Sequence, residues 1–575
     1  MIKLPEIFRE HMVLQQNKNI VVWGETNKKY VRVELDDKEV IGKSVNGRFE
    51  VSLPPLKAGG PHILKVIAGN NSENFKILDG ESVVIGDVMV GEVWLACGQS
   101  NMELEINGSY KAENVLKNMN NNSIRFYYTP KCAYEGEELD SLKKDAHWSI
   151  ANGDYNTAEE AGKWSAVAYY FAEKLSKELG VTVGIINCNW GGTHAYCWIS
   201  REEITANNRI KRFMDEYDEI VKNQKPEDYD REYAEYVVYQ AEFDRKCGEY
   251  YATHEHPSWE ECIELCGENR YPGPVGPKAF TRPAGLYEVM LKQVMPYTLK
   301  GFIYYQGEED DQTPELYYDL MFSMIRNWRK DWKDDNLPVL LVQLPMFKNE
   351  SDKDFKNWPL VREAQARVAK TIKNTGVAVI TDRGELNNIH PVHKLDVGFR
   401  LGNIALNVAY KKAEEKDVYG PTFKQIIVEK NKVTIEFDYA DDGIIVRSEN
   451  DNSDLCKEFN PKTKEEMDEM LESYKNYSGY ICSGDNYVKS FEVAGMDKVY
   501  YEADEVSIDK NSIVVSSSKV DVPVYVRYNW TNFGKVMLYG NNGLPVAPFR
   551  SSMEDGSDNW DTSEKAVENR FGQAI

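Results

Sequence analysis

One serine in the chain lies where a predicted buried strand runs into a predicted helix. Residues 93–102 read VWLACGQSNM, an apolar run that turns at Gly98 and continues as a helix from Ser100. If this strand belongs to a parallel sheet, its carboxyl end opens on the crevice in which α/β proteins bind ligands. A serine hydroxyl in that crevice can attack an acyl carbon, and the backbone N–H of Ser100, at a helix N-terminus, can face the developing oxyanion.

The same segment also has a purely structural interpretation. Ser100 and Glu103 have the Ser-x-x-Glu spacing of a capping box, in which the serine side chain caps the helix. Helix caps are far commoner than nucleophiles, so this segment taken alone favours the cap. The choice depends on whether other loops supply a base and oxyanion donors.

The candidate general base is His390, in the polar loop 381–391 that follows the last predicted parallel strand. A base for Ser100 must lie within hydrogen-bond reach of its hydroxyl, and loops at one edge of a sheet permit this. A lone loop histidine is more often simply solvated. The position of His390 after a strand is therefore more informative than its residue type.

Two further loops follow predicted strands and offer oxyanion donors. They are residues 189–193, NWGGT, and residues 305–310, YQGEED. The N–H of Gly192 and the side-chain amide of Gln306 can complete an oxyanion hole with the Ser100 N–H. The structural alternatives are an ordinary glycine turn and a glutamine that only holds its loop.

The elements that must position these loops are indicated by hydrophobic periodicity. Strand-like apolar runs alternate with amphipathic helical segments, which predicts an α/β fold with a parallel sheet flanked by helices. The predicted parallel strands are 93–97, 183–188, 301–305, 339–344 and 377–381. Short alternating strands before and after this region predict antiparallel β domains at the N-terminus and the C-terminus.

These patterns divide the chain into five expected segments. They are an N-terminal β domain at 1–87, the two parts of an α/β hydrolase domain at 88–200 and 281–415, a helical insertion at 201–280, and a C-terminal β domain at 416–575 with a polar insertion near 450–480. A chain of 575 residues is long enough for several such domains.

Composition excludes several classes of protein. The chain has 69 basic and 93 acidic residues, a net charge of −24 and no block dense in Lys or Arg, so nucleic acid and anionic membranes are not expected partners. The apolar runs are too short to span a bilayer. Nine scattered cysteines without a C-x-x-C pair, and no signal-peptide pattern, predict a cytoplasmic protein, or a secreted one if a leader has been removed.

One segment contains residue types that bind metals. His254 and His256 are followed by Cys262 and Cys266, but this spacing matches no known zinc pattern. We therefore predict no metal site from the sequence.

Taken together, the strand-end motifs resemble those of the sialate O-acetylesterase family, within the wider class of SGNH (GDSL-like) hydrolases. The matching motifs are 98–102 (GQSNM), 191–193 (GGT), 305–308 (YQGE) and 389–391 (IHP) with Lys394; further matches are 12–15, 53–60, 527–530 and 543–545. The resemblance implies an SGNH-hydrolase-like fold and a serine esterase that hydrolyses O-acetyl esters on sugars, most simply O-acetylated sialic acid, without metal or organic cofactor. An acetylated sugar or oligosaccharide is then the expected partner, and no oligomeric state is predicted.

The sequence departs from the family pattern beside the histidine. Asn388 stands where the family usually has an aspartate, and an amide cannot stabilise an imidazolium by charge. Glu308 is the favoured third member, because related sugar acetylesterases use the glutamate of this Gln-Gly-Glu motif. Asp382 and Glu385 are the alternatives, as is a Ser-His dyad supported by Asn388.

A second departure is Asp310, where many relatives carry asparagine. A carboxylate directed into an oxyanion hole would oppose the developing charge, so we expect Asp310 to be turned away from the Gln306 amide. Two rival functions remain at this level: a deacetylase of xylan or another polysaccharide, and a non-catalytic carbohydrate-binding protein.

Overall fold

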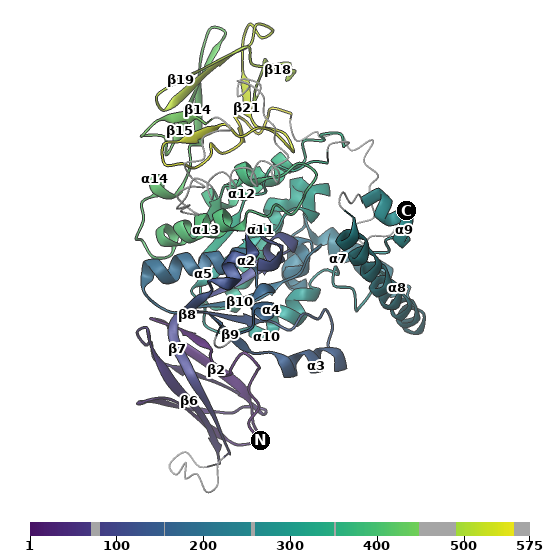
Figure 1. Ribbon diagram of the computed structural model, residues 1–575, viewed down its shortest axis with the longest axis vertical. Helices are drawn as coiled ribbons and strands as arrows, with labels where there is room; N and C mark the ends of the chain where they lie inside the picture. The colour runs from purple at the N-terminus through teal and green to yellow at the C-terminus, as the bar shows by residue number, and fades with distance from the viewer. Residues whose placement is uncertain (71–80, 154–155, 255–258, 350–351, 448–489, 557–575) are drawn as a thin grey trace.

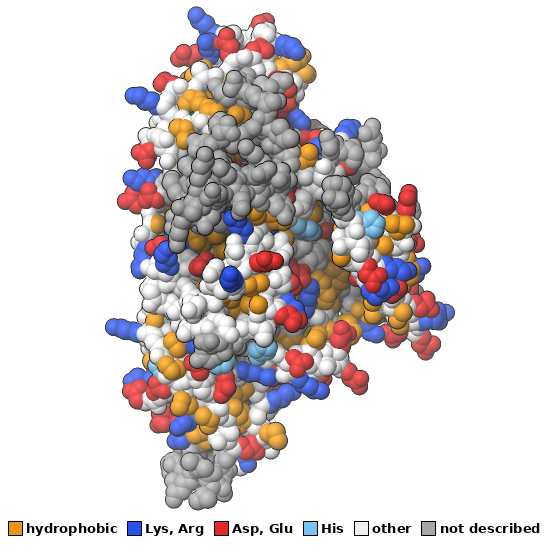
Figure 2. All heavy atoms as spheres, viewed as in Figure 1, with side chains coloured by type: hydrophobic (Ala, Val, Ile, Leu, Met, Phe, Trp, Pro, Cys, Tyr) orange, Lys and Arg blue, Asp and Glu red, His pale blue; other side chains and the backbone are white. Residues whose placement is uncertain are grey.

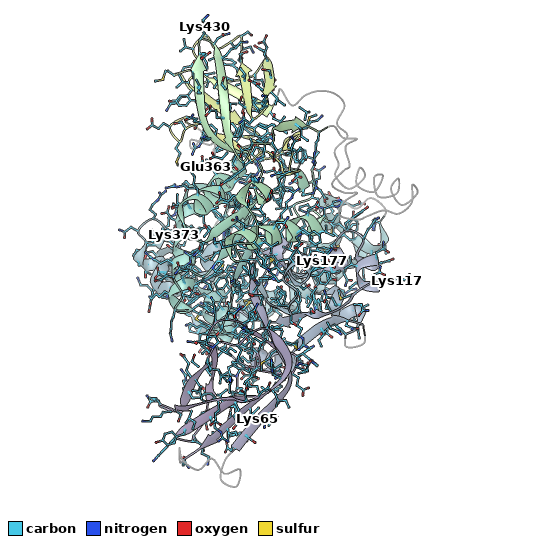
Figure 3. The ribbon with its side chains drawn as sticks, turned by 90° about the vertical axis from the view of Figure 1, so that its left-hand side faces the viewer. Lys65, Lys117, Lys177, Glu363, Lys373 and Lys430 are labelled. Atoms are coloured by element: carbon cyan, nitrogen blue, oxygen red, sulfur yellow. The ribbon has the colours of Figure 1, made fainter. Side chains whose placement is uncertain are left out.

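The computed structural model describes residues 1–70, 81–153, 156–254, 259–349, 352–447 and 490–556. Three parts follow one another along its long axis: the N-terminal strands, the helix-covered sheet in the middle and the C-terminal strands (Figure 1). In the side view, Lys65 lies among the N-terminal strands and Lys430 at the opposite end of the molecule (Figure 3). The predicted polar insertion near 450–480 lies outside the described residues.

The middle part contains a parallel sheet with strand order β13-β12-β11-β7-β10-β8, extended by β9, which pairs antiparallel with β8. Its strands are β7 (Glu81–Gly98), β8 (Asn120–Tyr128), β9 (Trp148–Asn152), β10 (Val183–Asn189), β11 (Gly301–Tyr305), β12 (Val339–Val342) and β13 (Thr375–Ala378). The five predicted parallel strands are all present. The sequence prediction missed β8 and β9, because β8 begins with a polar run, Asn120 to Ser123, that hides its apolar end.

Helices cover both faces of this sheet. In β7, Trp94 packs edge-on against Phe171, and in β11, Phe302 packs on Trp328. Phe302 pairs in register with Leu95, the neighbour of Trp94, so the two aromatic contacts lie on opposite faces. The helices on these faces are α5 (Ala166–Leu179) with α13 (Lys394–Val408), and α11 (Tyr317–Asp331) with α12 (Trp358–Thr371). Burial on both faces explains the continuous apolar runs of β10 and β11.

Strand β7 connects the parallel sheet to the N-terminal strands. Its first half pairs antiparallel with β6, and its second half pairs parallel with β10 and β11. The N-terminal strands are β1 (Val13–Gln15), β2 (Ile20–Glu25), β3 (Tyr30–Leu35), β4 (Lys38–Lys43), β5 (Arg48–Leu53) and β6 (Gly59–Gly69). One continuous hydrophobic core runs from these strands through the parallel sheet. Residue 87, the expected domain boundary, lies inside β7.

The expected insertion is helical. It consists of α6 (Arg201–Ala206), α7 (Lys211–Lys222), the 28-residue α8 (Pro226–Thr253) and α9 (Trp259–Cys266). Helices α8 and α9 project from one side of the molecule, where their surface carries charged side chains of both signs (Figures 1 and 2). The shorter helices elsewhere are α1 (Ser100–Glu103), α2 (Ala112–Lys117), α3 (Glu137–Asp145), α4 (Ala158–Gly162), α10 (Lys292–Val294) and α14 (Glu415–Val418).

The C-terminal part is antiparallel and has its own hydrophobic core. Its strands are β14 (Thr422–Glu429), β15 (Lys432–Asp438), β16 (Ile444–Val446), β17 (Phe491–Ala494), β18 (Tyr500–Glu502), β19 (Glu505–Asp509), β20 (Ser512–Ser516), β21 (Tyr525–Tyr528), β22 (Leu538–Gly540) and β23 (Phe549–Arg550). Throughout the described parts of the chain, none of the helices combines the length and apolar character needed to cross a lipid bilayer.

Candidate active site

The strand ends bring the predicted loops together at the centre of the sheet. Strand β7 lies between β10 and β11, and Gly98 is paired with Asn189 on one side and Tyr305 on the other. Gly98 has a φ of +142°, and a Cβ atom there would lie 2.1 Å from the Tyr305 carbonyl oxygen. Only glycine fits this close approach, and the turn it permits places Ser100 as the first residue of α1.

Ser100 and His390 meet across this edge. The distance from His390 Nε2 to Ser100 Oγ is 2.8 Å, although the two residues are 290 positions apart. Both residues are half-buried. With the imidazole neutral and Nε2 unprotonated, the serine hydroxyl donates to Nε2, which is the arrangement that lets a base take the hydroxyl proton.

The capping-box interpretation of this segment is wrong. The N-cap of α1 is Gln99, and no side chain caps the helix. The Glu103 carboxylate instead accepts a hydrogen bond from the Gly191 N–H at 2.5 Å and forms an ion pair with Lys131. Glu103 therefore links α1 to the loop that follows β10.

The environment of His390 favours its neutral form. Burial and the nearby charge of Lys394 lower the pKa of His390 to about 4, against the opposing effect of Glu103. A neutral imidazole at neutral pH is ready to act as a general base.

The pH dependence of activity tests this environment. Because the base must be neutral, activity is lost as the pH falls through the pKa of His390, and we expect this loss near pH 4 rather than near the ordinary histidine value of 6.5. Lys394→Met removes a cation that opposes protonation, so the acidic limb of kcat/KM should move to higher pH. The measurement is hydrolysis of a small aryl acetate across pH, with circular dichroism confirming that the protein stays folded. A wild-type limb near 6.5, or a limb that Lys394→Met leaves in place, contradicts the account.

A buried polar cluster lies behind the serine and the histidine. Asn101 Nδ2 donates to Glu308 Oε1 at 2.5 Å and to the Ile389 carbonyl at 2.9 Å, while Asn101 Oδ1 accepts from Lys394 Nζ at 2.5 Å. Asn101, Glu308 and Lys394 are all buried. Burial raises the pKa of Glu308 to about 7 and lowers that of Lys394 to about 7. The Asn101 amide thus lies between an acid and a base and fixes the backbone next to His390.

Glu308 does not occupy the position expected of a triad acid. Its hydrogen bond is to Asn101, and its other oxygen, Oε2, is buried without a hydrogen-bond partner among the described residues. In the part of the chain that the structure describes, no side chain hydrogen-bonds His390 Nδ1. Glu308 reaches the histidine only through Asn101 and the backbone of Ile389.

The other candidate acids have different partners. Asp382 pairs with Arg400 through both carboxylate oxygens, at 2.6 and 2.8 Å, and these arginine contacts hold its pKa below the ordinary value despite burial. Glu385 accepts from Asn388 Nδ2 at 2.7 Å and from the Val392 N–H at 2.8 Å. Asn388 Oδ1 in turn accepts from the backbone N–H of His390 at 3.0 Å. Asn388 and Glu385 therefore support the histidine loop rather than the imidazole ring.

Two of the three expected oxyanion donors are available. Among the described residues, the N–H groups of Ser100 and Gly192 donate to no protein acceptor. Gly192 has a φ of +64°, and a Cβ atom there would overlap the Tyr271 hydroxyl at 1.5 Å, so the turn requires glycine. This loop is adjacent to the serine, since a Cβ on Gly191 would lie 3.2 Å from Ser100 Cβ.

The expectation for Gln306 and Asp310 is wrong. Gln306 Nε2 donates to Asp310 Oδ2 at 2.5 Å and to the Thr193 carbonyl at 3.1 Å, so its amide is already engaged. Asp310 Oδ2 also accepts from the Ala195 N–H at 2.9 Å. Asp310 therefore faces Gln306 instead of turning away, and the two side chains tie the loops after β10 and β11 together.

An aromatic wall next to the serine loop was not predicted. The rings of Trp190 and Phe280 stack at 5.0 Å with 10° between their planes, Tyr271 packs against Phe280 at 5.6 Å, and Lys131 Nζ lies 5.0 Å from the Trp190 ring. Tyr271 and Phe280 come from the segment that leaves the helical insertion. Their residue types were visible in the sequence, but no spacing signal connected them with Trp190.

Comparisons with known proteins show which proteins this chain is similar to. The chain is 28% identical over 447 residues to sialate O-acetylesterase of Mus musculus, covering 72% of this chain and 75% of the mouse protein. It is 26% identical over 426 residues to the Homo sapiens sialate O-acetylesterase, covering 69% of each. A carbohydrate acetylesterase from Xanthomonas citri has a similar structure, with a TM-score of 0.69 and 26% identity over 96% of this chain and all of the other.

A family profile identifies the family to which the chain belongs. The profile described as carbohydrate esterase, sialic acid-specific acetylesterase, matches residues 90–256 and 276–400, just over half of the chain. The matched residues include Ser100, His390 and the loops that follow β10 and β11, but not Tyr271. The chain therefore belongs to the sialic acid-specific acetylesterase family of carbohydrate esterases.

Proposed function

We propose that this carbohydrate O-acetylesterase transfers the acetyl group of an O-acetylated sugar first to Ser100 and then to water, without metal or organic cofactor. The observation that carries the proposal is the 2.8 Å contact between Ser100 Oγ and His390 Nε2 at the strand-end crevice. No other serine–histidine contact of this kind joins two strand-end loops in the described chain.

Ser100 forms the covalent bond to the acetyl group, and His390 moves the protons. His390 Nε2 takes the proton of the Ser100 hydroxyl as Oγ bonds to the acetyl carbon, and it gives that proton to the departing sugar oxygen. Water then enters, loses a proton to His390 and attacks the acetyl-serine. As the acyl bond breaks, His390 returns that proton to Ser100 Oγ, and the acetic acid released ionises to acetate. With no carboxylate on Nδ1 among the described residues, we propose a Ser-His dyad whose loop is held by Asn388, Glu385 and the Asn101 cluster.

The developing negative charge needs donors that are already in place. We propose the backbone N–H groups of Ser100 and Gly192, because both lie beside the Ser100 side chain and neither is engaged elsewhere in the described chain. Each donor of this kind contributes about 3 kcal/mol to transition-state stabilisation in comparable enzymes. Gln306 acts indirectly, by fixing the Thr193 carbonyl and hence the Gly192 turn.

The favoured substrate is O-acetylated sialic acid. The family description and the mammalian relatives that cover most of this chain support it. The aromatic wall of Trp190, Phe280 and Tyr271 gives a sugar an apolar surface to pack against. The net charge of −24 argues against nucleic acid as a partner.

The test is acetate release from two substrates, 9-O-acetylated sialic acid and acetylated xylan, at equal concentrations of acetyl ester. We expect a higher kcat/KM on the sialic acid ester. Faster release of acetate from xylan would make acetylated xylan the substrate and would leave the proposed mechanism unchanged. Absence of turnover even on a small aryl acetate would contradict the enzymatic assignment and favour a carbohydrate-binding role.

A further inference from the structure

Three cysteines converge between α8 and α9, away from the proposed catalytic residues. Cys247 lies on α8, and Cys262 and Cys266 lie one turn apart on α9. The Sγ atoms of Cys247 and Cys262 are 3.2 Å apart, those of Cys262 and Cys266 are 3.9 Å apart, and all three lie within 4.8 Å of one another. Two helices thus direct three thiols at a single point.

This spacing resembles one face of a thiolate metal site. A metal ion bound to sulfur at about 2.3 Å in tetrahedral geometry holds its sulfur ligands about 3.8 Å apart. We propose that Cys247, Cys262 and Cys266 bind one thiophilic metal ion of the Zn²⁺ type and that this ion fastens α9 to α8. The fourth position is left for a water molecule or another small ligand.

The packing around the cysteines explains why a metal ion would matter there. Among the residues whose burial the structure describes, the cluster is a small satellite core formed by four buried side chains, Phe243, Cys247, Tyr250 and Cys262. So few apolar side chains bury little surface, and small units of this kind are commonly stabilised by disulfides or metals. Cys266 is only partly buried, which gives an ion a route to the sulfur atoms.

Helix α8 also contacts the segment that leads from α9 to the aromatic wall beside Ser100. Two residues that follow α9 contact Tyr239 of α8. The Tyr239 hydroxyl donates to the Glu268 carbonyl at 2.8 Å, and the Arg270 guanidinium lies 3.8 Å from the Tyr239 ring. A Cβ on Gly273 would lie 2.5 Å from the Tyr236 ring, so this part of the chain packs closely on α8. The segment between these contacts carries Tyr271. An ion that fixes α9 on α8 would therefore also stabilise the segment that presents Tyr271.

The site differs from the pattern rejected in the sequence. That pattern consists of His254, His256, Cys262 and Cys266, whereas the cluster contains no histidine and takes its third ligand from Cys247, 15 residues before Cys262. His254 Nδ1 faces the Tyr250 carbonyl at 2.8 Å, in the turn that ends α8. Pairing of two helices, and not spacing along the chain, creates the cluster.

The test uses the full-length protein, purified with a reducing agent and stripped of metal. Zn²⁺ is titrated in competition with a chromophoric chelator, and Co²⁺ is added separately to look for sulfur-to-cobalt charge-transfer absorption. We expect one ion per chain with thiolate absorption. Loss of a ligand should weaken binding more than roughly 100-fold, the upper end of what changes around metal ligands cause.

Two variants and a matched control separate ligand loss from misfolding. Cys262→Ser removes the central thiol, and Cys266→Ser removes the partly exposed one, whose loss should leave the fold intact. The control Cys132→Ser alters a buried cysteine outside the cluster and should bind like wild type. Limited proteolysis gives a second readout, since Zn²⁺ should slow cleavage within α9 in wild type and in the control only.

Three results would overturn the proposal: no stoichiometric binding of Zn²⁺, unchanged binding by Cys266→Ser, or formation of a Cys247–Cys262 disulfide in air that added Zn²⁺ does not slow. The proposed esterase function stands or falls separately, because acetate release is measured independently of metal content.

Discussion

Ser100→Ala is expected to reduce kcat for acetate release by roughly 10⁴- to 10⁶-fold, the range seen when other serine hydrolases lose their nucleophile. The variant keeps the backbone N–H of residue 100, the Gly192 turn and His390, so it retains substrate binding and oxyanion donors. What it loses is the atom that forms the acyl-enzyme. The measurement is a steady-state assay on O-acetylated sialic acid and on a small aryl acetate.

The matched control for this variant is Ser109→Ala. Ser109 directly follows the short 3-10 turn Ile106–Gly108. Its hydroxyl donates to the Ile106 carbonyl at 2.7 Å and contacts neither Ser100 nor His390, so its loss should change the rate little. An aryl ester that releases a fluorescent product, supplied in excess over the enzyme, gives a second readout. Wild type should show an initial burst of product, and Ser100→Ala should show none. If the activity of Ser100→Ala were within tenfold of wild type, the proposed covalent mechanism would be contradicted.

The position of the site followed from the sequence because parallel strands impose it. Each motif stands directly after an apolar run, and the carboxyl ends of parallel strands must meet at one edge. This reasoning placed Ser100, His390 and Gly192 in one region without any information on side-chain contacts. The two flanking β regions were predictable for a similar reason, since the period of the apolar residues changes from helical spacing to two.

The hydrogen-bond partners could not be predicted in the same way. The sequence offered a Ser100–Glu103 capping box as an alternative to the nucleophile, and it suggested that Gln306 faces the oxyanion and that Glu308 touches His390. In the structure these side chains bond to Gly191, Asp310 and Asn101 instead. Each choice depends on the exact backbone positions of the loops, and residue type alone carries no such information.

Hydrogen bonds around Asn388 and Asn101 position His390 without an aspartate beside it. Where an aspartate beside the histidine would bring a charge into the loop, Asn388 uses its two amide ends to join Glu385 to the backbone of His390. Glu308 and Lys394 do not contact the imidazole ring; both side chains hydrogen-bond to Asn101, which lies between them. The histidine is thus positioned by neutral hydrogen bonds, and the nearest buried cation favours its neutral form.

The second large effect is expected from His390→Ala, which should lower kcat by a factor similar to that of Ser100→Ala, roughly 10⁴- to 10⁶-fold. Without Nε2 at 2.8 Å, no described side chain takes the proton of Ser100 Oγ, and the hydroxyl is a poor nucleophile in its protonated form. The control is His147→Ala, an exposed histidine paired with Glu160 that should leave kcat unchanged.

The double variant Ser100→Ala with His390→Ala distinguishes a catalytic unit from two independent contributions. If the serine and the histidine act only together, removing the second after the first costs nothing further, and the double variant should be about as slow as either single one. If the two losses instead multiply, each residue contributes to catalysis on its own, and the 2.8 Å contact is not the step that governs acyl transfer.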